Sequence, residues 1–402
     1  MHGSPGSTLC NGCLFQGARR WWPPTGRHDE RMSDDAGSVT EQTATLLWEA
    51  CRRDPDPAGV RRALAGEADT GWAVRAASDQ RIGALLWRAL SAAGSLDALG
   101  PDRATLGDMA DAFKMEAVLL LPRAIALAVL PLTEVGLEPV VFKGPAVATR
   151  YPEPGLRPMD DIDLLLPLAH HQQALETLGR AGWQVTRPGA GGHYDTVLSH
   201  REIPSFLLEV HYGLEGTSER ATALDSDRLW ARRQPLECAG TKAFGLPPVE
   251  EIVVLAAHAG KPHHRFVRLV WMADLAMIVG HAEMHDIAID WDRVLYVARA
   301  ARCATVVGAA LAMARRAGLD APVGLFPLPT RGHRGDSIRR LLSVTWPLSQ
   351  LDLTDYQFNY ALTDGRARRA GMLLRHLVLG HGLRHRARRV AGLPPRVPSR
   401  PK

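Results

Sequence analysis

Cysteine is scarce in this chain, and the few cysteines present form no recognisable framework. The 402 residues include five, an odd number, and most of them lie far apart. Such a set implies no disulfide scaffold of the kind that small secreted proteins use. Cys10 and Cys13 form a lone Cys-x-x-Cys pair without a second ligand pair, so a zinc or redox site is less well supported than a disordered leader.

Long hydrophobic runs are also missing. The longest, residues 118–132, contains Arg123 and two prolines and is too short to span a bilayer. The N-terminus lacks the continuous apolar segment and the small-residue cleavage site of a secretory signal. We therefore expect no transmembrane segment and a cytoplasmic location. Met32 is an alternative start, which would leave residues 1–31 as an upstream extension.

Acidic residues are absent from the C-terminal segment. Residues 365–402 hold eleven Arg and Lys and no acid, whereas residues 32–364 carry 33 basic and 41 acidic residues. An acidic body thus precedes a basic tail, although the whole chain has a net charge of +5. Such a tail is able to contact nucleic acid, anionic lipid or an acidic partner. The plainer interpretation is a solvated helix with a frayed, proline-rich end.

Length and apolar periodicity divide the chain into several units, because 402 residues exceed one ordinary domain. The Gly-, Pro- and Ser-rich residues 1–40 are expected to be disordered. Residues 41–135 and 247–320 have helical spacing. Residues 136–246 combine an amphipathic helix, 168–182, with short strands at 137–142, 161–167, 183–187, 193–200 and 205–214. Residues 321–402 are expected to be partly helical and to end in the basic tail. The sequence therefore predicts an α+β protein, with a mixed β-sheet between two helical units.

Two carboxylates stand within one predicted strand. In FKGPAVATRYPEPGLRPMDDIDLLLP, residues 142–167, Asp161 and Asp163 flank Ile162 in an otherwise apolar segment. Strand alternation points both carboxylates to one face, with ~7 Å of rise between them, while Ile162 faces the core. A buried carboxylate is costly unless a cation or hydrogen bonds satisfy it. The pair therefore indicates a metal-dependent site for phosphoryl or nucleotidyl transfer.

A third carboxylate lies in the next apolar strand, SFLLEVHYGL. Glu209 there stands between Leu208 and Val210, so its side chain points away from theirs. Three carboxylates on adjacent strands suit Mg²⁺, and two bridging ions would activate a hydroxyl and hold the leaving pyrophosphate in line. His211 shares the face of Glu209. It either contacts substrate, orients a carboxylate or is an ordinary buried histidine.

The phosphates of a nucleotide would lie at the turn before these strands. Gly144 lets the chain pass close to an anion, the helix start after it offers free N–H groups, and Lys143 adds a positive charge. Arg157, four residues before Asp161, is a second candidate for binding the triphosphate.

These motifs, in this order, resemble the uncharacterised nucleotidyltransferases of the DNA-polymerase-β-like superfamily. The family pattern is a strand ending in Lys-Gly, a Tyr-Pro-x-Pro-x-x-Arg-Pro loop, an Asp-x-Asp strand and a Glu-x-His strand. Residues 142–167 and 207–214 match it in this order. The resemblance covers most of residues 41–320 and implies a polymerase-β-like nucleotidyltransferase core flanked by helices.

The resemblance also implies roles for individual residues. Asp161 and Asp163 would bind Mg²⁺, and Glu209 would be the third acidic residue and a general base for the acceptor. Gly144 would mark the phosphate-binding turn. Similar transferases commonly place a serine after this glycine and use it to bind phosphate, whereas this chain has Pro145.

In similar two-domain transferases the helical unit closes over the cleft. The resemblance thus implies that Lys261 and Arg268 meet phosphate or substrate. His258, His263 and His264 surround Lys261, but their spacing matches no zinc motif, and histidines at a helix end oppose its dipole favourably.

The predicted function is Mg²⁺-dependent transfer of NMP from an NTP to a hydroxyl-type acceptor, with two metal ions and release of pyrophosphate. The acidic body and the lack of a separate nucleic-acid-binding module favour a small molecule, peptide or protein as acceptor. One alternative is a catalytically silent nucleotide- or partner-binding protein of the same fold, which Pro145 favours and the three carboxylates oppose. Another is an RNA-modifying nucleotidyltransferase that holds RNA with its basic tail.

Overall fold

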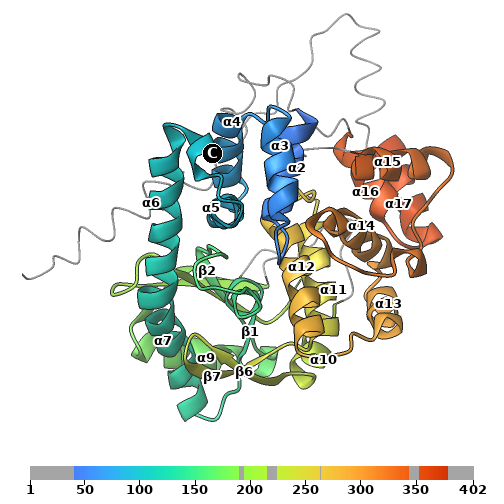
Figure 1. Ribbon diagram of the computed structural model, residues 1–402. Helices are drawn as coiled ribbons and strands as arrows, with labels where there is room; N and C mark the ends of the chain where they lie inside the picture. The colour runs from blue at the N-terminus through green and yellow to red at the C-terminus, as the bar shows by residue number, and fades with distance from the viewer. Residues whose placement is uncertain (1–39, 190–193, 215–223, 263, 344–352, 379–402) are drawn as a thin grey trace, which may run out of the picture.

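The computed structural model describes residues 40–189, 194–214, 224–262, 264–343 and 353–378. The leader expected before residue 40, with its Cys10–Cys13 pair, lies outside these ranges, and so does the basic tail beyond residue 378. Within them the predicted α+β class is confirmed, because helices flank one mixed sheet (Figure 1). The three described cysteines are free and buried, which agrees with the expectation of no disulfide framework.

Helices form the first part of the described chain, as expected. They are α2 (Glu41–Ala50), α3 (Pro57–Ala65), α4 (Thr70–Asp79), α5 (Gly83–Ala92) and the short 3₁₀ turn η1 (Leu96–Leu99). The side chains of Thr40, Asp56 and Asp69 accept backbone N–H bonds in the first turns of α2, α3 and α4, which favours helix starts at these points. Arg81 has a left-handed backbone (φ 60°) and separates α4 from α5.

A continuous helix, Asp102–Glu134, runs along one side of the sheet (Figure 1). It consists of α6 (Asp102–Met115), the π-helical segment η2 (Glu116–Leu120) and α7 (Leu121–Glu134). By length and composition alone, its 33 residues are long and apolar enough to cross a membrane. The sequence did not indicate this, because the apolar run 118–132 by itself is too short. The buried residues of α7 pack under the sheet, as in a core helix. The cytoplasmic location stays a prediction.

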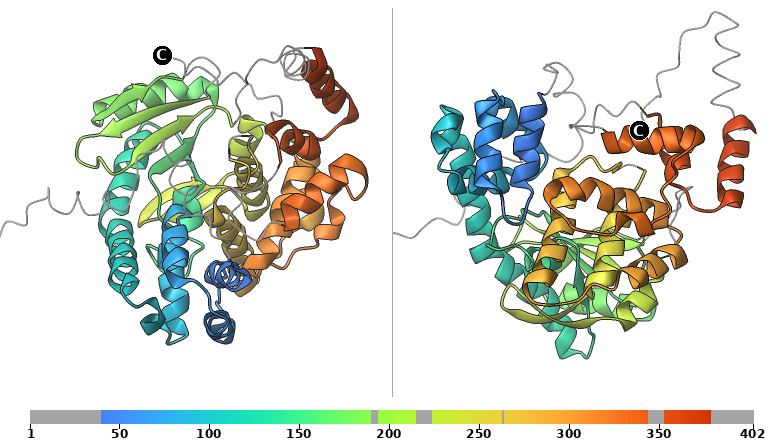
Figure 2. Two further views of the ribbon diagram at one scale, coloured as in Figure 1. Left: turned by 90° about the horizontal axis from the view of Figure 1, so that it is seen from above. Right: turned by 45° about the vertical axis from the view of Figure 1, so that its right-hand side comes forward.

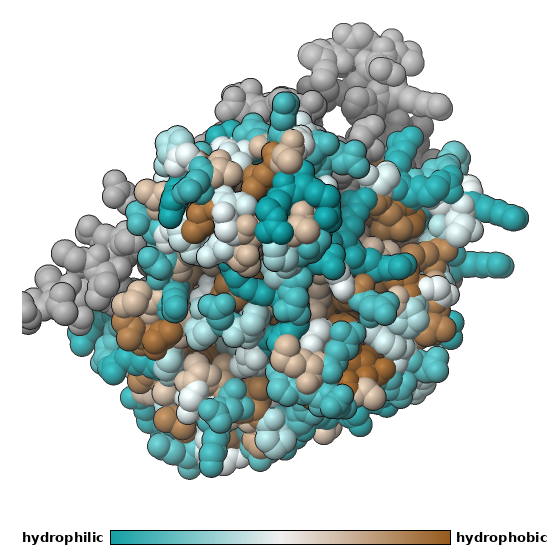
Figure 3. Space-filling model, in the orientation of Figure 1, coloured by the Kyte–Doolittle hydropathy of each residue, from teal (hydrophilic) through white to brown (hydrophobic). Residues whose placement is uncertain are grey.

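The outer side of this helix carries exposed apolar side chains. A third (33%) of its most apolar window is buried, and Met115, Val118 and Leu119 are about half exposed. Figure 3 shows hydrophobic side chains gathered over this junction of α6 and α7 at the left of the molecule, on a face that is otherwise largely hydrophilic. The apolar character of the helix is therefore divided between core and surface.

The described strands form one seven-stranded sheet. They are β1 (Val140–Phe142), β2 (Asp161–Leu165), β3 (Trp183–Arg187), β4 (Asp195–His200), β5 (Leu207–His211), β6 (Gln234–Cys238) and β7 (Thr241–Gly245). Their order is β3-β4-β5-β2-β1-β7-β6, with β2 parallel to β5, β1 parallel to β7 and the other neighbours antiparallel. The first five lie at strands that the sequence predicts, whereas the β6–β7 hairpin was not expected.

Short helices connect these strands. They are α8 (Gly144–Ala148), α9 (Leu168–Arg180) and α10 (Ser226–Ala231). α9 is the predicted amphipathic helix, and it stops just before Gly182, whose left-handed φ of 98° is the conformation expected of a terminating glycine.

The last part of the chain is helical again. It contains α11 (Pro248–Ala259), α12 (Leu269–Met284), α13 (Trp291–Ala300), α14 (Ala304–Ala314), the 3₁₀ turns η3 (Arg315–Ala317) and η4 (Val323–Leu325), α15 (Gly332–Ser343), α16 (Asp355–Leu362) and α17 (Arg366–Val378). One hydrophobic cluster joins these helices to α2–α6, since it extends from Leu46 to Phe113 and from Val249 to Leu362. Figure 2 shows the N-terminal helices, in blue, beside the yellow and orange C-terminal ones. The two helical units thus share a core, and the domain boundaries given above stay predictions.

The two faces of the sheet have different surroundings. Ile162 and Leu164 of β2 enter the core formed with α7 and α9. Asp163 alternates to the opposite face, as predicted. Around β1 that face packs against α10 and α11 through Leu229 and Val254. The carboxylates therefore lie on the side of the sheet that meets the C-terminal helices.

Candidate functional site

Asp163 is the centre of the candidate site. Strand register places it beside Phe142 of β1 on one side and beside Glu209 of β5 on the other. Its side chain is almost fully buried (2% exposed), whereas that of Glu209 is partly exposed. The two carboxylates that the sequence places in separate strands are therefore neighbours on one face.

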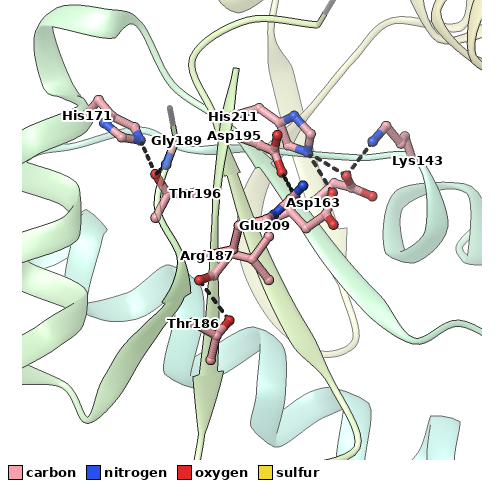
Figure 4. A network of polar contacts seen from close by, with 11 residues as sticks. Lys143, Asp163, His171, Thr186, Arg187, Gly189, Asp195, Thr196, Glu209 and His211 are labelled. Carbon is pink, nitrogen blue, oxygen red and sulfur yellow. Dashed lines mark hydrogen bonds and ion pairs between the residues drawn. The ribbon is translucent and has the colours of Figure 1, made fainter. Parts of the chain in front are cut away.

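Two basic side chains contact Asp163 (Figure 4). Lys143 Nζ lies 2.5 Å from Asp163 Oδ1. His211 Nε2 lies 2.7 Å from the same oxygen and 3.3 Å from Glu209 Oε2, so it bridges the two carboxylates. The ring of His211 also packs edge-on against Phe142, with 5.1 Å between ring centroids. Of the alternatives weighed for His211, the structure shows contact with the carboxylates.

The pKa values follow from this arrangement. Burial alone would raise the pKa of Asp163, but the charge of Lys143 and the bond from His211 hold it below its usual range. Burial lowers the pKa of Lys143 and of His211, and the neighbouring carboxylates more than reverse this, so both end above their ordinary values. Asp161 behaves differently, because burial and the charges of Asp163 and Glu209 raise its pKa to about 7.

A metal ion would find a suitable ligand group here. Among the described residues, Asp163, Glu209 and His211 form a group whose potential ligand atoms all lie within 4.8 Å of one another. Two of the three carboxylates predicted as metal ligands thus converge. Asp161 lies outside this group, although the charges of Asp163 and Glu209 raise its pKa. Its role as a metal ligand stays a prediction.

The Lys-Gly turn differs from the expectation in detail. The left-handed backbone falls on Lys143 (φ 53°, ψ −129°), which precedes α8, whereas Gly144 is the first residue of the helix. A β-carbon on Gly144 would meet its neighbours at 3.5 Å or more, an ordinary contact distance. Pro145 fills the first turn of α8 and is buried. The strained residue is therefore the lysine whose ammonium contacts Asp163.

Arg157 has a defined partner in the helical part. Its Nε and Nη2 donate to the two carboxylate oxygens of Asp274 on α12, at 3.1 and 3.0 Å, and its Nη1 donates to the carbonyl of Pro158. Tyr151 also donates to Asp274, at 2.7 Å. These bonds tie the loop before β2 to α12, and the predicted contact of Arg157 with a triphosphate stays a prediction.

The sequence reasoning missed a further cation at the site. Arg81 of the α4–α5 break forms an ion pair with Asp160, directly before Asp161. Burial lowers the pKa of Arg81 to about 10, against the opposing effect of Asp160. Arg268 also acts electrostatically on Asp160 and Asp161. A clear signal was lacking, because Arg81 follows an ordinary helical pattern and approaches Asp160 through tertiary packing alone.

The histidine region near α11 packs with an aromatic side chain. His258 and His264 lie with ring centroids 4.4 Å apart, and both contact Trp271. Burial, His264 and the charge of Lys143 lower the pKa of His258 well below its usual value. The charge of Lys261 contributes to the same lowering of the pKa of His258. His263 lies outside the described residues, and the metal-ligand group named above includes neither His258 nor His264.

The comparison with known families shows which family this chain belongs to. A family described as "Uncharacterised nucleotidyltransferase" matches residues 66–317. The chain belongs to this family. The resemblance drawn from the motifs is therefore confirmed, and the general activity of the family is nucleotidyl transfer. No curated protein matches the chain. The matched residues of this nucleotidyltransferase include the whole sheet, the carboxylates and the helices from α4 to α14.

Proposed function

We propose that this nucleotidyltransferase moves NMP from an NTP to a hydroxyl-type acceptor with the help of Mg²⁺ and releases pyrophosphate. The observation that carries the proposal is the convergence of Asp163 and Glu209 on one face, bridged by His211 and next to Lys143. The preferred acceptor is a small molecule, peptide or protein, and a cytoplasmic location agrees with the use of NTP.

The donor set fits Mg²⁺. Two carboxylates supply the oxygen ligands that this ion prefers, and His211 orients both. We propose that Asp161 and Asp163 hold the metal, with Glu209 completing the site and a second ion sharing it. When bound, the metal supplies positive charge that stabilises the pyrophosphate as it leaves.

The residues of this chain divide the remaining work. Glu209 is more exposed than Asp163 and takes the proton of the acceptor hydroxyl. The hydroxyl oxygen then bonds to the α-phosphorus, and the bond from that phosphorus to the β-phosphate oxygen breaks. Lys143, Arg268 and Lys261 are the proposed phosphate contacts, because Lys143 contacts Asp163, Arg268 interacts electrostatically with Asp161, and Lys261 acts on the neighbouring His258. Gly144 would let the phosphates approach the backbone of this turn.

The decisive experiment measures pyrophosphate release and transfer of label from α-labelled NTPs to acceptors from a cell extract. Asp163→Asn is expected to lower both by at least about 100-fold, because the charge that holds the metal is removed. Asp97→Asn is the matched control, since the Asp97 side chain is 94% exposed and lies outside the site.

Asp163 is buried in a charge network, so its substitution could also harm folding. Glu209→Gln, at a partly exposed carboxylate, is therefore tested beside it, with thermal unfolding of each variant as a check. Equal pyrophosphate release in wild type and in well-folded Asp163→Asn and Glu209→Gln would contradict the proposal. No release by the wild type would favour the alternative, a nucleotide- or partner-binding protein of the same fold. The RNA-modifying alternative rests on the basic tail, most of which lies outside the described residues.

A further inference from the structure

An irregularity in β3 changes the direction of one arginine. Trp183 and Val185 pair with His200 and Leu198 of β4, and the face they share includes Trp183 in the core with α9, whereas Val185 is 51% exposed. Regular alternation would put Arg187 on that face too. The register shifts between Val185 and Arg187, so that Arg187 pairs with Val197 instead. A bulge of this kind re-aims the side chains that follow it.

The shift brings Arg187 to the carboxylate face. Val197 is the partner of Glu209, and Glu209 is the partner of Asp163, so the four residues form one row across four strands. Neighbouring strands lie ~4.8 Å apart, which places the Cα atom of Arg187 ~10 Å from that of Glu209. The arginine is therefore the positive end of a row whose other members include the central carboxylates.

Asp195 holds this arginine in place. Its carboxylate forms an ion pair with Arg187 Nη2, and register puts Asp195 directly beside His211 (Figure 4). The Asp195 side chain is 13% exposed, whereas that of Arg187 is 43% exposed. A guanidinium has five N–H donors in a planar fork, so it can bind a carboxylate on one edge and a second anion on another.

Positive charges lie on both sides of the two central carboxylates, Asp163 and Glu209, along the sheet. Lys143 follows β1, on one side of Asp163, while Arg187 lies on β3, on the other side of Glu209. The charges of Lys143, Arg157 and Lys261 all lower the pKa of His258 on α11. If the phosphates of the nucleotide lie at Lys143, the β3–β4 side of Glu209 remains available for the acceptor. Exposure on this side is uneven, because Leu207 is 42% exposed whereas Val197, between Arg187 and Glu209, is 6% exposed.

We propose that Arg187, steadied by Asp195, binds an anionic group of the acceptor. This inference rests on the proposed function and names its substrate class: a hydroxyl compound that also carries a carboxylate or phosphate. The reacting hydroxyl lies at Glu209, and the anionic group lies at the guanidinium of Arg187, which is paired with Asp195, the register neighbour of His211. Asp195 acts as a positioning residue, because it contacts the guanidinium and not the acceptor.

The test uses the full chain with Mg²⁺, an α-labelled NTP and a small-molecule fraction of a cell extract at limiting concentration. Arg187→Met is expected to lower transfer of label about 10- to 100-fold, the effect of losing one charge-assisted contact. More extract should restore part of the transfer, and affinity for a non-hydrolysable NTP analogue should stay within about two-fold of wild type. Arg187→Lys should retain part of the activity, since it keeps the charge and loses the fork.

The matched control is Arg123→Met, which removes an exposed arginine paired with Glu202 on the α7 side of the molecule. This variant is expected to transfer label as wild type does. The acceptor released from the labelled product by a phosphodiesterase should bind an anion exchanger.

Three results would overturn the inference: wild-type transfer by Arg187→Met, a released acceptor without negative charge, or a loss of NTP-analogue affinity as large as the loss of transfer. The last would assign Arg187 to the triphosphate. A wild-type protein that transfers no label would overturn the proposed function itself, and with it this inference.

Discussion

Glu251 is a buried acid on α11 that takes no part in the proposed chemistry. Its side chain is 2% exposed, and its nearest cation is Arg150, with Nε 3.5 Å from Glu251 Oε2. Burial raises the pKa of Glu251 to about 7, against the opposing effect of Arg150 and with a smaller contribution from Asp274. The folded protein therefore holds a proton at this position that the unfolded chain releases at lower pH.

This proton gives stability a pH dependence of known sign. The pKa of Glu251 is 4.5 in the unfolded reference and about 7 in the fold, so its contribution is fully present below pH 4.5 and is lost as pH rises through 7. The loss is on the order of 3 kcal/mol. Glu251→Gln removes it, so the variant should gain stability relative to wild type between pH 5 and pH 8.

Urea unfolding at the two pH values measures this gain, with Glu134→Gln at the exposed end of α7 as control. Parallel pH profiles for wild type and Glu251→Gln would show that Glu251 ionises normally in the fold.

Single residues of the site were predictable to different degrees. Asp163 and Glu209 were expected to lie on one face because strand alternation is a local rule that the sequence displays directly, and the role of Asp161 stays a prediction. Arg81 and Arg187 were not expected at the site, since one reaches it through packing of distant helices and the other through a bulge. Such placements depend on contacts that a single sequence does not reveal.

At the scale of elements, the loop before β2 depends on one glycine. Gly155 has a left-handed φ of 87°, and a β-carbon there would lie 2.5 Å from Lys114 Cα and 2.9 Å from the Phe113 carbonyl carbon of α6. Gly155→Ala is therefore expected to destabilise the fold by about 2–4 kcal/mol, through both backbone strain and a clash with backbone that cannot move freely.

Gly94→Ala separates these two effects. Gly94 also has a left-handed φ, of 63°, but a β-carbon there meets nothing within 4 Å. This control should cost about 1 kcal/mol in urea unfolding. Equal costs for the two variants would mean that the loop moves away from α6 without penalty.

The β6–β7 hairpin shows why one element escaped prediction. β6 contains Pro235, which ordinarily argues against a strand but is tolerated at the edge of a sheet, where β6 lies. Its turn is formed by Ala239 and Gly240, both with positive φ (48° and 77°). A turn of this geometry usually begins with Asn, Asp or Gly. Because Ala239 stands there instead, the sequence carries no signal for a hairpin turn.

At the scale of the whole molecule, one buried ion pair joins the catalytic core to the helices. Asp274 is completely buried (0% exposed) and is bound by Arg157 and Tyr151. Asp274→Leu leaves the guanidinium of Arg157 buried without its partner and is expected to cost about 3–5 kcal/mol. The double variant with Arg157→Met should cost clearly less than the sum of the single variants.

Urea unfolding of the four proteins of this cycle gives the coupling energy. The exposed pair of Arg103 and Asp97 provides the control, and Arg103→Met should change stability little. Additive costs for the Arg157 and Asp274 variants would show that the pair does not link the two parts energetically.

The order of units along the chain was predictable, but their association was not. Apolar periodicity indicates which face of each helix is buried and leaves open which helix covers it. The structure places α2–α6 in one cluster with helices from α11 to α16.

That shared core has a consequence for synthesis. The helices made first, α2–α5, complete their core with helices that begin at residue 248 and continue to residue 362. At ordinary translation rates of about 5–20 residues per second, those partners leave the ribosome roughly 10 to 50 s later. During this interval the nascent chain presents unpaired apolar helices, which is when a chaperone would protect it most. Completion of the core of α2–α5 therefore waits for the synthesis of residues 248–362.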